Sequence, residues 1–210
     1  MTTAAWVGLD VAAAFAIGNW TAVARGSKSL EYLCKPATMV ALLVVALAVE
    51  PEIDGRRTWF VVALALSLAG DVFLMLPGDL FVPGLGSFLL AHVAYVVGLV
   101  AAGLDPLGVL AGLVLVAAAF AVVGTRLLRG IRRRDPAMAL PVVAYMAAIS
   151  AMVVCAVGTG DGVAIAGALS FYASDSLIGW GRFVAGGDGN RLAVMVTYHV
   201  GQALLVLSLV

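Results

Sequence analysis

Four apolar stretches of this 210-residue chain carry ionisable or hydrogen-bonding side chains that a lipid-facing helix would not carry. They are Asp71 in SLAGDVFLML, His92 and Tyr95 in SFLLAHVAYVVGL, Asp175 in LSFYASDSLIGW, and Tyr198, His199 and Gln202 in VMVTYHVGQALLVL. A charged side chain in the hydrocarbon of a bilayer costs about 2.5–3.5 kcal/mol by insertion measurements, so such residues face one another or a water-filled cavity. The pattern predicts a polar site inside a helical bundle.

The residue types in this set suit general acid–base catalysis. Burial favours the protonated form of one carboxyl group, and a nearby lysine such as Lys35 would keep a second carboxyl group ionised. Asp71 and Asp175 are therefore the candidate acid–base pair, in either order, and His92 is the third candidate catalytic residue. The residues expected to bind and orient a substrate are Lys35, Tyr95, Tyr145, Tyr198 and Gln202.

Several of these residues also have a purely structural interpretation. The two aspartates could be hydrogen-bonded packing groups, Lys35 could extend to the lipid headgroups, and Tyr145 could belong to an interfacial belt. Because His199 directly follows Tyr198, it points about 100° away, and we expect it to lie outside the site. Glu31, four residues before Lys35, could pair with that lysine at the interface.

The sequence lacks the motifs of two common hydrolase chemistries, nucleophilic serine catalysis and zinc catalysis. The chain contains no G-x-S-x-G nucleophile motif and no H-E-x-x-H zinc motif. Two histidines cannot form a three-histidine zinc site, whereas a mixed site of Asp71, His92, Asp175 and His199 stays open. We expect no metal and no other cofactor.

The composition is that of an integral membrane protein. Hydrophobic residues make up 63% of the chain and charged residues 11%, and the mean hydropathy is +1.11. A soluble domain carries about 25% charged residues. The length predicts one transmembrane helical domain over residues 1–210, and a net charge of zero gives no indication of a nucleic-acid partner.

Apolar runs of membrane-spanning length predict an all-α polytopic bundle of eight helices, with seven as the alternative. The expected spans are 4–24, 34–50, 58–76, 84–103, 106–128, 139–158, 162–184 and 191–209. The connections RGSKS, EPEIDGRR, PGDLFVPG, LDP, RGIRRRDP, GTGDG and GGDGN all contain glycine, proline or charge. The first run lacks a preceding basic residue, so we interpret it as a membrane helix rather than a signal peptide.

Loop charges predict the orientation. With eight spans, nine basic residues lie on one side, and only Arg56 and Arg57 lie on the other. The nine are Arg25, Lys28, Arg126, Arg129, Arg132, Arg133, Arg134, Arg182 and Arg191. Basic loops remain cytoplasmic, so we expect a multi-pass protein of the cell membrane with both termini outside. Cys34 and Cys155 then lie near opposite faces, and we expect no disulfide between them.

The same topology places the polar residues at a common depth. At a helical rise of about 1.5 Å per residue, they fall within roughly 14 Å of the cytoplasmic interface. The residues concerned are Lys35, Asp71, His92, Tyr145, Asp175 and Tyr198. Helical spacing also puts His92 with Tyr95, and Tyr198 with Gln202, on shared faces. We therefore expect one cavity that opens toward the cytoplasmic leaflet.

Five segments, in order, resemble the lysoplasmalogenase-like family of integral membrane proteins, also called YhhN. They are CKP at 34–36, SLAGDVFLML around Asp71, SFLLAHVAYVVGL around His92, FYASDSLIGWGRF around Asp175, and TYHVGQALLVLS around Tyr198. The resemblance extends over nearly the whole chain. The last segment reads YHVGQ where the family often has a second aromatic residue and an alanine before the glutamine, which leaves the role of His199 open.

The resemblance implies hydrolysis of the vinyl ether bond of a lysoplasmalogen. The products would be a fatty aldehyde and glycerophospho-ethanolamine or glycerophospho-choline, and the partners would be a lysophospholipid substrate and membrane lipids. The oligomeric state stays open. The alternatives are a hydrolase of another lysolipid, a proton-coupled carrier of a small molecule or lipid, and a lipid-binding scaffold. The carrier is disfavoured because the polar residues end at mid-membrane, whereas transport needs a path to both faces.

Overall fold

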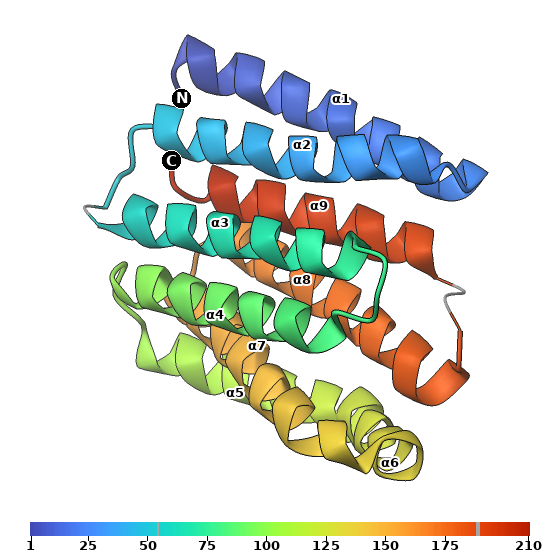
Figure 1. The fold of residues 1–210 in the computed structure, drawn as a ribbon. Helices are drawn as coiled ribbons and strands as arrows, with labels where there is room; N and C mark the ends of the chain where they lie inside the picture. Colours follow the sequence, from blue (N-terminus) through green and yellow to red (C-terminus); the bar gives the residue numbers. More distant parts are fainter. Residues whose placement is uncertain (54, 188–189) are drawn as a thin grey trace.

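The computed structural model describes residues 1–53, 55–187 and 190–210, and helices make up most of this part of the chain (Figure 1). In order these are α1 (Thr3–Arg25), α2 (Lys28–Ala48), α3 (Arg56–Met75), α4 (Phe81–Val100), α5 (Pro106–Ala119), η1 (Phe120–Gly124), α6 (Thr125–Arg134), η2 (Pro136–Met138), α7 (Ala139–Thr159), α8 (Gly162–Trp180), η3 (Gly181–Ala185) and α9 (Arg191–Leu207). The predicted connections EPEIDGRR and GGDGN include positions 54, 188 and 189, which lie outside the described residues.

The helices form a multi-pass bundle. Over the described residues, seven helices are long and apolar enough to cross a membrane, and the apolar helix Arg191–Leu207 is shorter. α5, η1 and α6 run on as one helix, Pro106–Arg134, and η3 extends α8 to Ala185. The labelled chain ends lie at the same end of the bundle (Figure 1), as an even number of crossings requires. The prediction of an all-α polytopic membrane bundle is confirmed.

Two helix boundaries differ from the prediction. α2 begins at Lys28 rather than at residue 34, so Lys35 lies inside the helix and not at its start. The segment RGIRRRDP, predicted as a connection, is helical as far as Arg134. Apolar composition marks only the part of a helix within the hydrocarbon, whereas backbone hydrogen bonding continues into the interface. Three arginines in the last turn of α6 also interact favourably with the helix C-terminus.

The C-terminal helix α9 lies inside the bundle and packs against α1, α2, α3 and α8. Its contact with α8 is close because glycines meet there. A Cβ atom at Gly201 would lie 2.9 Å from the Phe171 backbone nitrogen, and one at Gly167 would lie 2.9 Å from the Leu205 nitrogen. This backbone-to-backbone approach, typical of small residues in membrane helices, brings Tyr198 on α9 next to Phe171 on α8.

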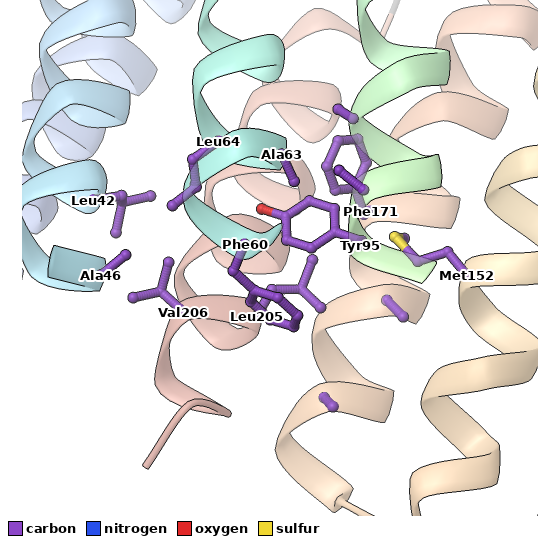
Figure 2. Close-up of a cluster of buried hydrophobic side chains, with 14 of the residues drawn as sticks. Leu42, Ala46, Phe60, Ala63, Leu64, Tyr95, Met152, Phe171, Leu205 and Val206 are labelled. Carbon is purple, nitrogen blue, oxygen red and sulfur yellow. The ribbon is translucent and has the colours of Figure 1, made fainter. Parts of the chain in front are cut away.

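A layer of buried apolar side chains lies in the middle of the bundle and packs its helices together (Figure 2). Phe60 of α3 packs edge-to-face on Tyr95 of α4, with ring centroids 5.0 Å apart. Leu64, Leu205 and Phe171 are fully buried. Side chains from α2, α3, α4, α7, α8 and α9 meet in this layer, which fixes the helices that carry the polar residues.

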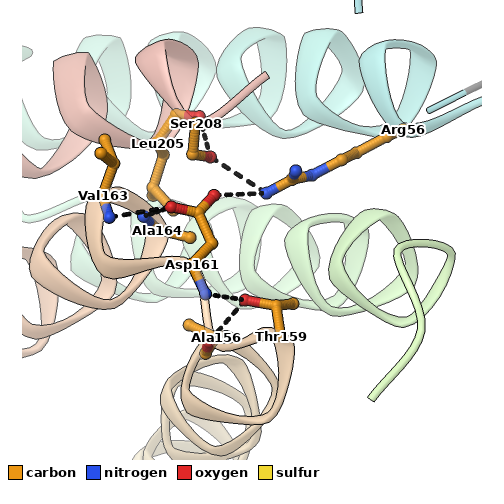
Figure 3. Close-up of polar contacts among 8 residues, drawn as sticks. All are labelled: Arg56, Ala156, Thr159, Asp161, Val163, Ala164, Leu205 and Ser208. Atoms are coloured by element: carbon orange, nitrogen blue, oxygen red, sulfur yellow. Dashed lines mark hydrogen bonds and ion pairs between the residues drawn. The ribbon is translucent and has the colours of Figure 1, made fainter. Parts of the chain in front are cut away.

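A polar clasp joins three helices at the end of the bundle where the chain termini lie (Figure 3). The carboxylate of Asp161 accepts from the backbone nitrogens of Val163 at 2.8 Å and Ala164 at 3.2 Å, and so caps α8. Its second oxygen lies 3.5 Å from the Arg56 guanidinium, which also donates to Ser208 Oγ at 3.1 Å. This network ties the start of α3 and the end of α9 to the start of α8.

Candidate active site

Three residues from three helices meet around one carboxylate oxygen. His92 Nε2 on α4 lies 2.9 Å from the hydroxyl of Tyr145 on α7 and 3.2 Å from Oδ2 of Asp175 on α8. The Tyr145 hydroxyl donates to the same Asp175 oxygen. We call these residues the Asp175 cluster. A carboxyl group with two hydrogen-bonding neighbours in fixed positions can hold or release a proton with a defined geometry.

The Asp175 cluster is buried but not sealed. His92 is fully buried and Tyr145 is 8% exposed, whereas the Asp175 side chain retains 11% exposure. The second ring nitrogen of His92, Nδ1, has no hydrogen-bond partner within the described part of the chain. Asp175 is thus the member of the cluster that a bound molecule can reach most directly.

The other aspartate lies in a separate cluster with a different partner set. Asp71 Oδ1 on α3 lies 2.9 Å from the ammonium of Lys35 on α2, and Oδ2 accepts from the Tyr198 hydroxyl on α9 at 2.7 Å. Asp71 is 1% exposed and Lys35 is 5% exposed. We call these residues the Asp71 cluster. Because each carboxylate oxygen has a donor, the arrangement compensates a buried negative charge.

Aromatic rings connect the two clusters. The ring of Phe171 lies 4.8 Å from that of His92 and 5.3 Å from that of Tyr198, centroid to centroid. Phe88 packs edge-to-face on both Phe171 and Tyr198. The structure therefore brings the predicted residues into one region of the bundle, but as two hydrogen-bonded groups with phenylalanines between them. Phe88 and Phe171 are not among the residues that the sequence predicted for the site.

A narrow apolar cleft leads to Asp175. Its cavity volume is about 70 Å³, and α4, η1, α6, α7, α8 and η3 supply most of its wall. Its polar lining residues are Tyr145, Tyr172, Asp175 and Ser176, and the rest of the lining is apolar or glycine. Asp71 is absent from this lining. The cleft has the character of a site for a hydrocarbon chain with its reactive end at a carboxyl group.

The remaining predicted residues take other positions. Tyr95 donates to Gln202 Oε1 at 2.5 Å, in the same buried region but outside both clusters. His199 accepts from Trp20 Nε1 at 3.2 Å, and among the described residues no hydrogen bond or ion pair links it to either aspartate. The mixed metal set of the sequence interpretation is therefore not assembled. In residues 1–53, 55–187 and 190–210, no three His, Cys, Asp or Glu side chains are grouped to hold a metal ion.

Glu31 corrects one expectation from sequence spacing. Its carboxylate lies 2.5 Å from the Arg191 guanidinium on α9 and 3.4 Å from the Lys28 ammonium, so it does not pair with Lys35. Lys35 instead turns toward Asp71. Spacing within one helix had identified a possible neighbour, but the approach of α9 to α2 supplied a better one.

Another ion pair lies where α3 and α4 are joined. Arg182 of η3 donates to both carboxylate oxygens of Asp79, at 3.3 and 2.8 Å, and its guanidinium lies 3.9 Å from the ring centroid of Phe81. The hydrogen bonds from Arg182 lower the pKa of Asp79 below its ordinary value, so this carboxylate is ionised at neutral pH. This contact holds Phe81 at the edge of the cleft.

Comparison with known proteins agrees with this architecture. The model of the YhhN family matches residues 30–209. The lysoplasmalogenase of Mycobacterium tuberculosis (strain CDC 1551 / Oshkosh) is 35% identical over 176 residues, which cover 79% of this chain and 66% of that protein. Lysoplasmalogenase TMEM86B is 35% identical in both Homo sapiens, over 70% of this chain and 61% of that protein, and Mus musculus, over 83% and 72%.

The chain thus spans about two thirds of the length of its mycobacterial relative, at 66%. No solved structure matches the fold. The family match covers the helices that carry both aspartate clusters, from residue 30 in α2 to residue 209 after α9. On this evidence the chain belongs to the YhhN family.

Proposed function

We propose that this protein is a lysoplasmalogenase, which hydrolyses the vinyl ether bond of a lysoplasmalogen to a fatty aldehyde and a glycerophospho-ethanolamine or glycerophospho-choline. The observation that carries the proposal is the position of Asp175, which is hydrogen-bonded to His92 and Tyr145 and lines an apolar cleft. The activity named for relatives at 35% identity supports it. A lysoplasmalogen has one hydrocarbon chain, and the lining of the cleft is mostly apolar.

The substrate lies with its alkenyl chain among the apolar residues of the cleft and its vinyl ether beside Asp175. Phe88, Ile149 and Val123 are among the side chains that would contact the hydrocarbon. Burial of a methylene group contributes about 0.8 kcal/mol, so the chain supplies much of the binding energy. The polar headgroup then extends toward the end of the bundle that holds Arg134 and Arg182.

The reaction begins with transfer of a proton from the Asp175 carboxyl group to the vinyl carbon that is not bonded to oxygen. The electrons of the carbon–carbon double bond form the new C–H bond, and the positive charge moves to an oxocarbenium ion. Water adds to the carbon next to oxygen and gives its proton to the Asp175 carboxylate. The hemiacetal then releases the glycerol oxygen as an alcohol and leaves an aldehyde. This sequence follows the logic of carboxyl catalysis in glycoside hydrolysis.

The neighbouring residues position this carboxyl group and balance charge. His92 and Tyr145 hold Asp175 in one orientation through their hydrogen bonds. Asp71, ion-paired with Lys35, is the second carboxyl group of the pair and supplies a fixed partner charge outside the cleft, while both proton transfers take place at Asp175. Asp175 is more exposed than Asp71, which favours Asp175 as the proton donor and Asp71 as the anionic partner. Tyr198 orients Asp71 through its hydrogen bond, and the hydrogen-bonded pair of Tyr95 and Gln202 lies in the same buried region.

The protein acts in the cell membrane with its basic end facing the cytoplasm. Arg126, Arg129, Arg132 and Arg133 lie at the same end of the bundle as Arg182 and Arg191. Positive charge on one set of loops favours retention in the cytoplasm. In this orientation the cleft and Asp175 are reached from the cytoplasmic leaflet, where a lysolipid would enter.

The direct test is aldehyde release by the purified protein in detergent, with lysoplasmenyl-ethanolamine as substrate. Wild type should release fatty aldehyde with and without EDTA, and Asp175→Asn should release none while its thermal unfolding stays close to that of wild type. Asp10→Asn, an exposed aspartate on α1, is the matched control and should keep full activity. Folded wild type that yields no aldehyde, but cleaves another lysolipid, would move the assignment to that lipid.

A further inference from the structure

A second cavity lies at the basic end of the bundle, next to the cleft. Its volume is about 680 Å³, and α2, η3 and α9 supply much of its wall. Its charged lining residues in the described part of the chain are Lys28, Lys35, Arg134, Arg182, Arg191 and Glu31. We call this cavity the basic vestibule. Lys35 and Arg182 are ion-paired with Asp71 and Asp79. The other three cations, Lys28, Arg134 and Arg191, face the single carboxylate of Glu31 in this wall, and the excess of positive charge favours an anionic ligand.

The lone carboxylate holds two of the cations in position. Glu31 is 6% exposed and contacts both the Arg191 guanidinium and the Lys28 ammonium, from α9 and from its own helix α2. The Lys28 side chain remains 62% exposed, and only one Arg191 nitrogen is engaged in that contact. An arginine presents five N–H groups in a planar fork, so donors of Arg191 remain for a ligand.

Two helices begin at the basic vestibule. α2 starts at Lys28 and α9 at Arg191, and neither preceding residue, Ser27 or Asn190, caps its helix with a side-chain hydrogen bond. The first backbone N–H groups of a helix carry partial positive charge and bind phosphate and carboxylate groups well. The helix ends therefore add to the attraction that the lysine and arginine side chains exert on an anion.

The basic vestibule and the apolar cleft share part of their wall. Leu74, Phe81 and Ile178 line both. Ile178 lies three residues after Asp175 on α8, so about 4.5 Å of helix rise separates the carboxyl group from the shared wall. In a lysoplasmalogen the glycerol unit separates the vinyl ether from the phosphate. One molecule can therefore place its reactive bond at Asp175 and its phosphate in the vestibule.

The geometry points to the basic vestibule as the binding site for the phosphate group of the lysolipid headgroup, with Lys28, Arg134 and Arg191 as donors and Glu31 as the residue that positions Arg191. This inference rests on the proposed function for the identity of the lipid. It adds a requirement that the cleft alone does not impose, because a lipid with the same chain but without phosphate should bind poorly.

The test measures binding rather than turnover. A negative result for the phosphate site can therefore be distinguished from a negative result for the hydrolase activity. The probes are a saturated 1-O-alkyl lysophospho-ethanolamine, which has no vinyl ether to cleave, and the 1-O-alkylglycerol with the same chain. Affinities are measured by calorimetry in a neutral detergent. The double variant Lys28→Gln/Arg134→Gln should bind the phospholipid about tenfold more weakly, because it loses charge-assisted hydrogen bonds. Its affinity for the alkylglycerol should not change.

The control variant Arg132→Gln/Arg133→Gln removes the same charge from exposed residues of α6 that do not line the vestibule. It should bind both probes like wild type. Equal weakening in both double variants would show general surface electrostatics and overturn the proposal, as would equal weakening for both probes. The single variant Lys28→Gln, which alters a largely exposed side chain, keeps the test decisive if the double variant does not fold.

Inorganic phosphate distinguishes a lipid headgroup from free phosphate as the source of the anion. It should compete only weakly with the alkyl lysophospholipid, because the hydrocarbon chain contributes much of that lipid's affinity. Binding of inorganic phosphate as tight as that of the lipid would identify a free-phosphate site and would contradict the headgroup assignment.

Discussion

Lys35 on α2 and Asp71 on α3 form an ion pair at 2.9 Å, with both side chains almost completely buried. Asp175 on α8 has a histidine and a tyrosine as neighbours, and among residues 1–53, 55–187 and 190–210 no lysine or arginine is paired with it. The two aspartates thus meet different electrostatic surroundings. On this difference we propose Asp175 as the proton donor and Asp71 as its ion-paired partner.

Breaking the buried ion pair on one side should destabilise the protein more than replacing both partners. Lys35→Met leaves the Asp71 charge without its cation and should lower stability by about 3–5 kcal/mol. Lys35→Met/Asp71→Asn removes both charges and should recover much of that loss, without recovering aldehyde release. Thermal unfolding in detergent is measured for Lys35→Met, Asp71→Asn and the double variant. Additive effects of the single substitutions would contradict a coupled pair.

Removing the hydrogen bond from Tyr145 to Asp175 should lower kcat more than it raises KM. Tyr145→Phe keeps the ring that lines the cleft and loses only the hydroxyl that orients the carboxyl group. A hydrogen bond to a charged group contributes about 1.5–3 kcal/mol, so the expected loss in kcat is about 10- to 100-fold. Tyr172→Phe is the comparison, because Tyr172 lines the cleft without a hydrogen bond to Asp175. A kcat loss of the same size in both variants would contradict a role specific to Tyr145.

Filling the cleft should discriminate between substrates by chain length. Gly179 lines the cleft, and a Cβ atom there would meet Leu127 at 3.4 Å, an ordinary contact, so Gly179→Ala should be tolerated. Gly179→Leu should raise KM most for the longest alkenyl chains, because its side chain occupies the hydrocarbon space. Gly86→Leu on α4 is the control, since Gly86 is exposed and open space surrounds its Cβ position. The measurement is KM across a series of chain lengths, and a uniform change would argue against the chain site.

The polar clasp of Asp161, Arg56 and Ser208 should affect the stability of the protein without affecting its turnover. Asp161→Ala removes the cap of α8 and the partner of Arg56, at the end of the bundle opposite the basic vestibule. Loss of an N-cap costs about 0.5–2 kcal/mol, and loss of the Arg56 contact adds to it. Thermal unfolding should shift downward while kcat measured well below that temperature stays unchanged. A lower kcat in the folded variant would show that the clasp communicates with the site.

The sequence predicted the helical bundle well because the bilayer imposes strong constraints. Spanning helices need long apolar runs, so the helices could be predicted from composition, whereas the common depth of Asp71, His92 and Asp175 stays a prediction from helix rise. The helix ends at Lys28 and Arg134 could not be predicted from apolar runs, because charged residues in the interface continue a helix beyond its apolar part.

The grouping of the site residues depended on contacts between helices that are distant in sequence. Spacing on α4 placed His92 and Tyr95 on one face, yet His92 meets Tyr145 and Asp175 while Tyr95 meets Gln202. Periodicity identifies the face of a helix but not the neighbour that it meets. The aromatic link through Phe171 and the pairing of Glu31 with α9 were missed for the same reason.

The most direct test of the account follows the proton delivered to carbon. Purified protein is allowed to hydrolyse lysoplasmenyl-ethanolamine in D₂O, and the fatty aldehyde is analysed by mass spectrometry, with unlabelled aldehyde and Asp175→Asn in the same solvent as the measure of spontaneous exchange. Proton transfer from Asp175 predicts an aldehyde that carries one deuterium on the carbon next to the carbonyl, well above that control, and only with Asp175 in place. An aldehyde without this deuterium, or equal release by Asp175→Asn, would contradict proton transfer from Asp175.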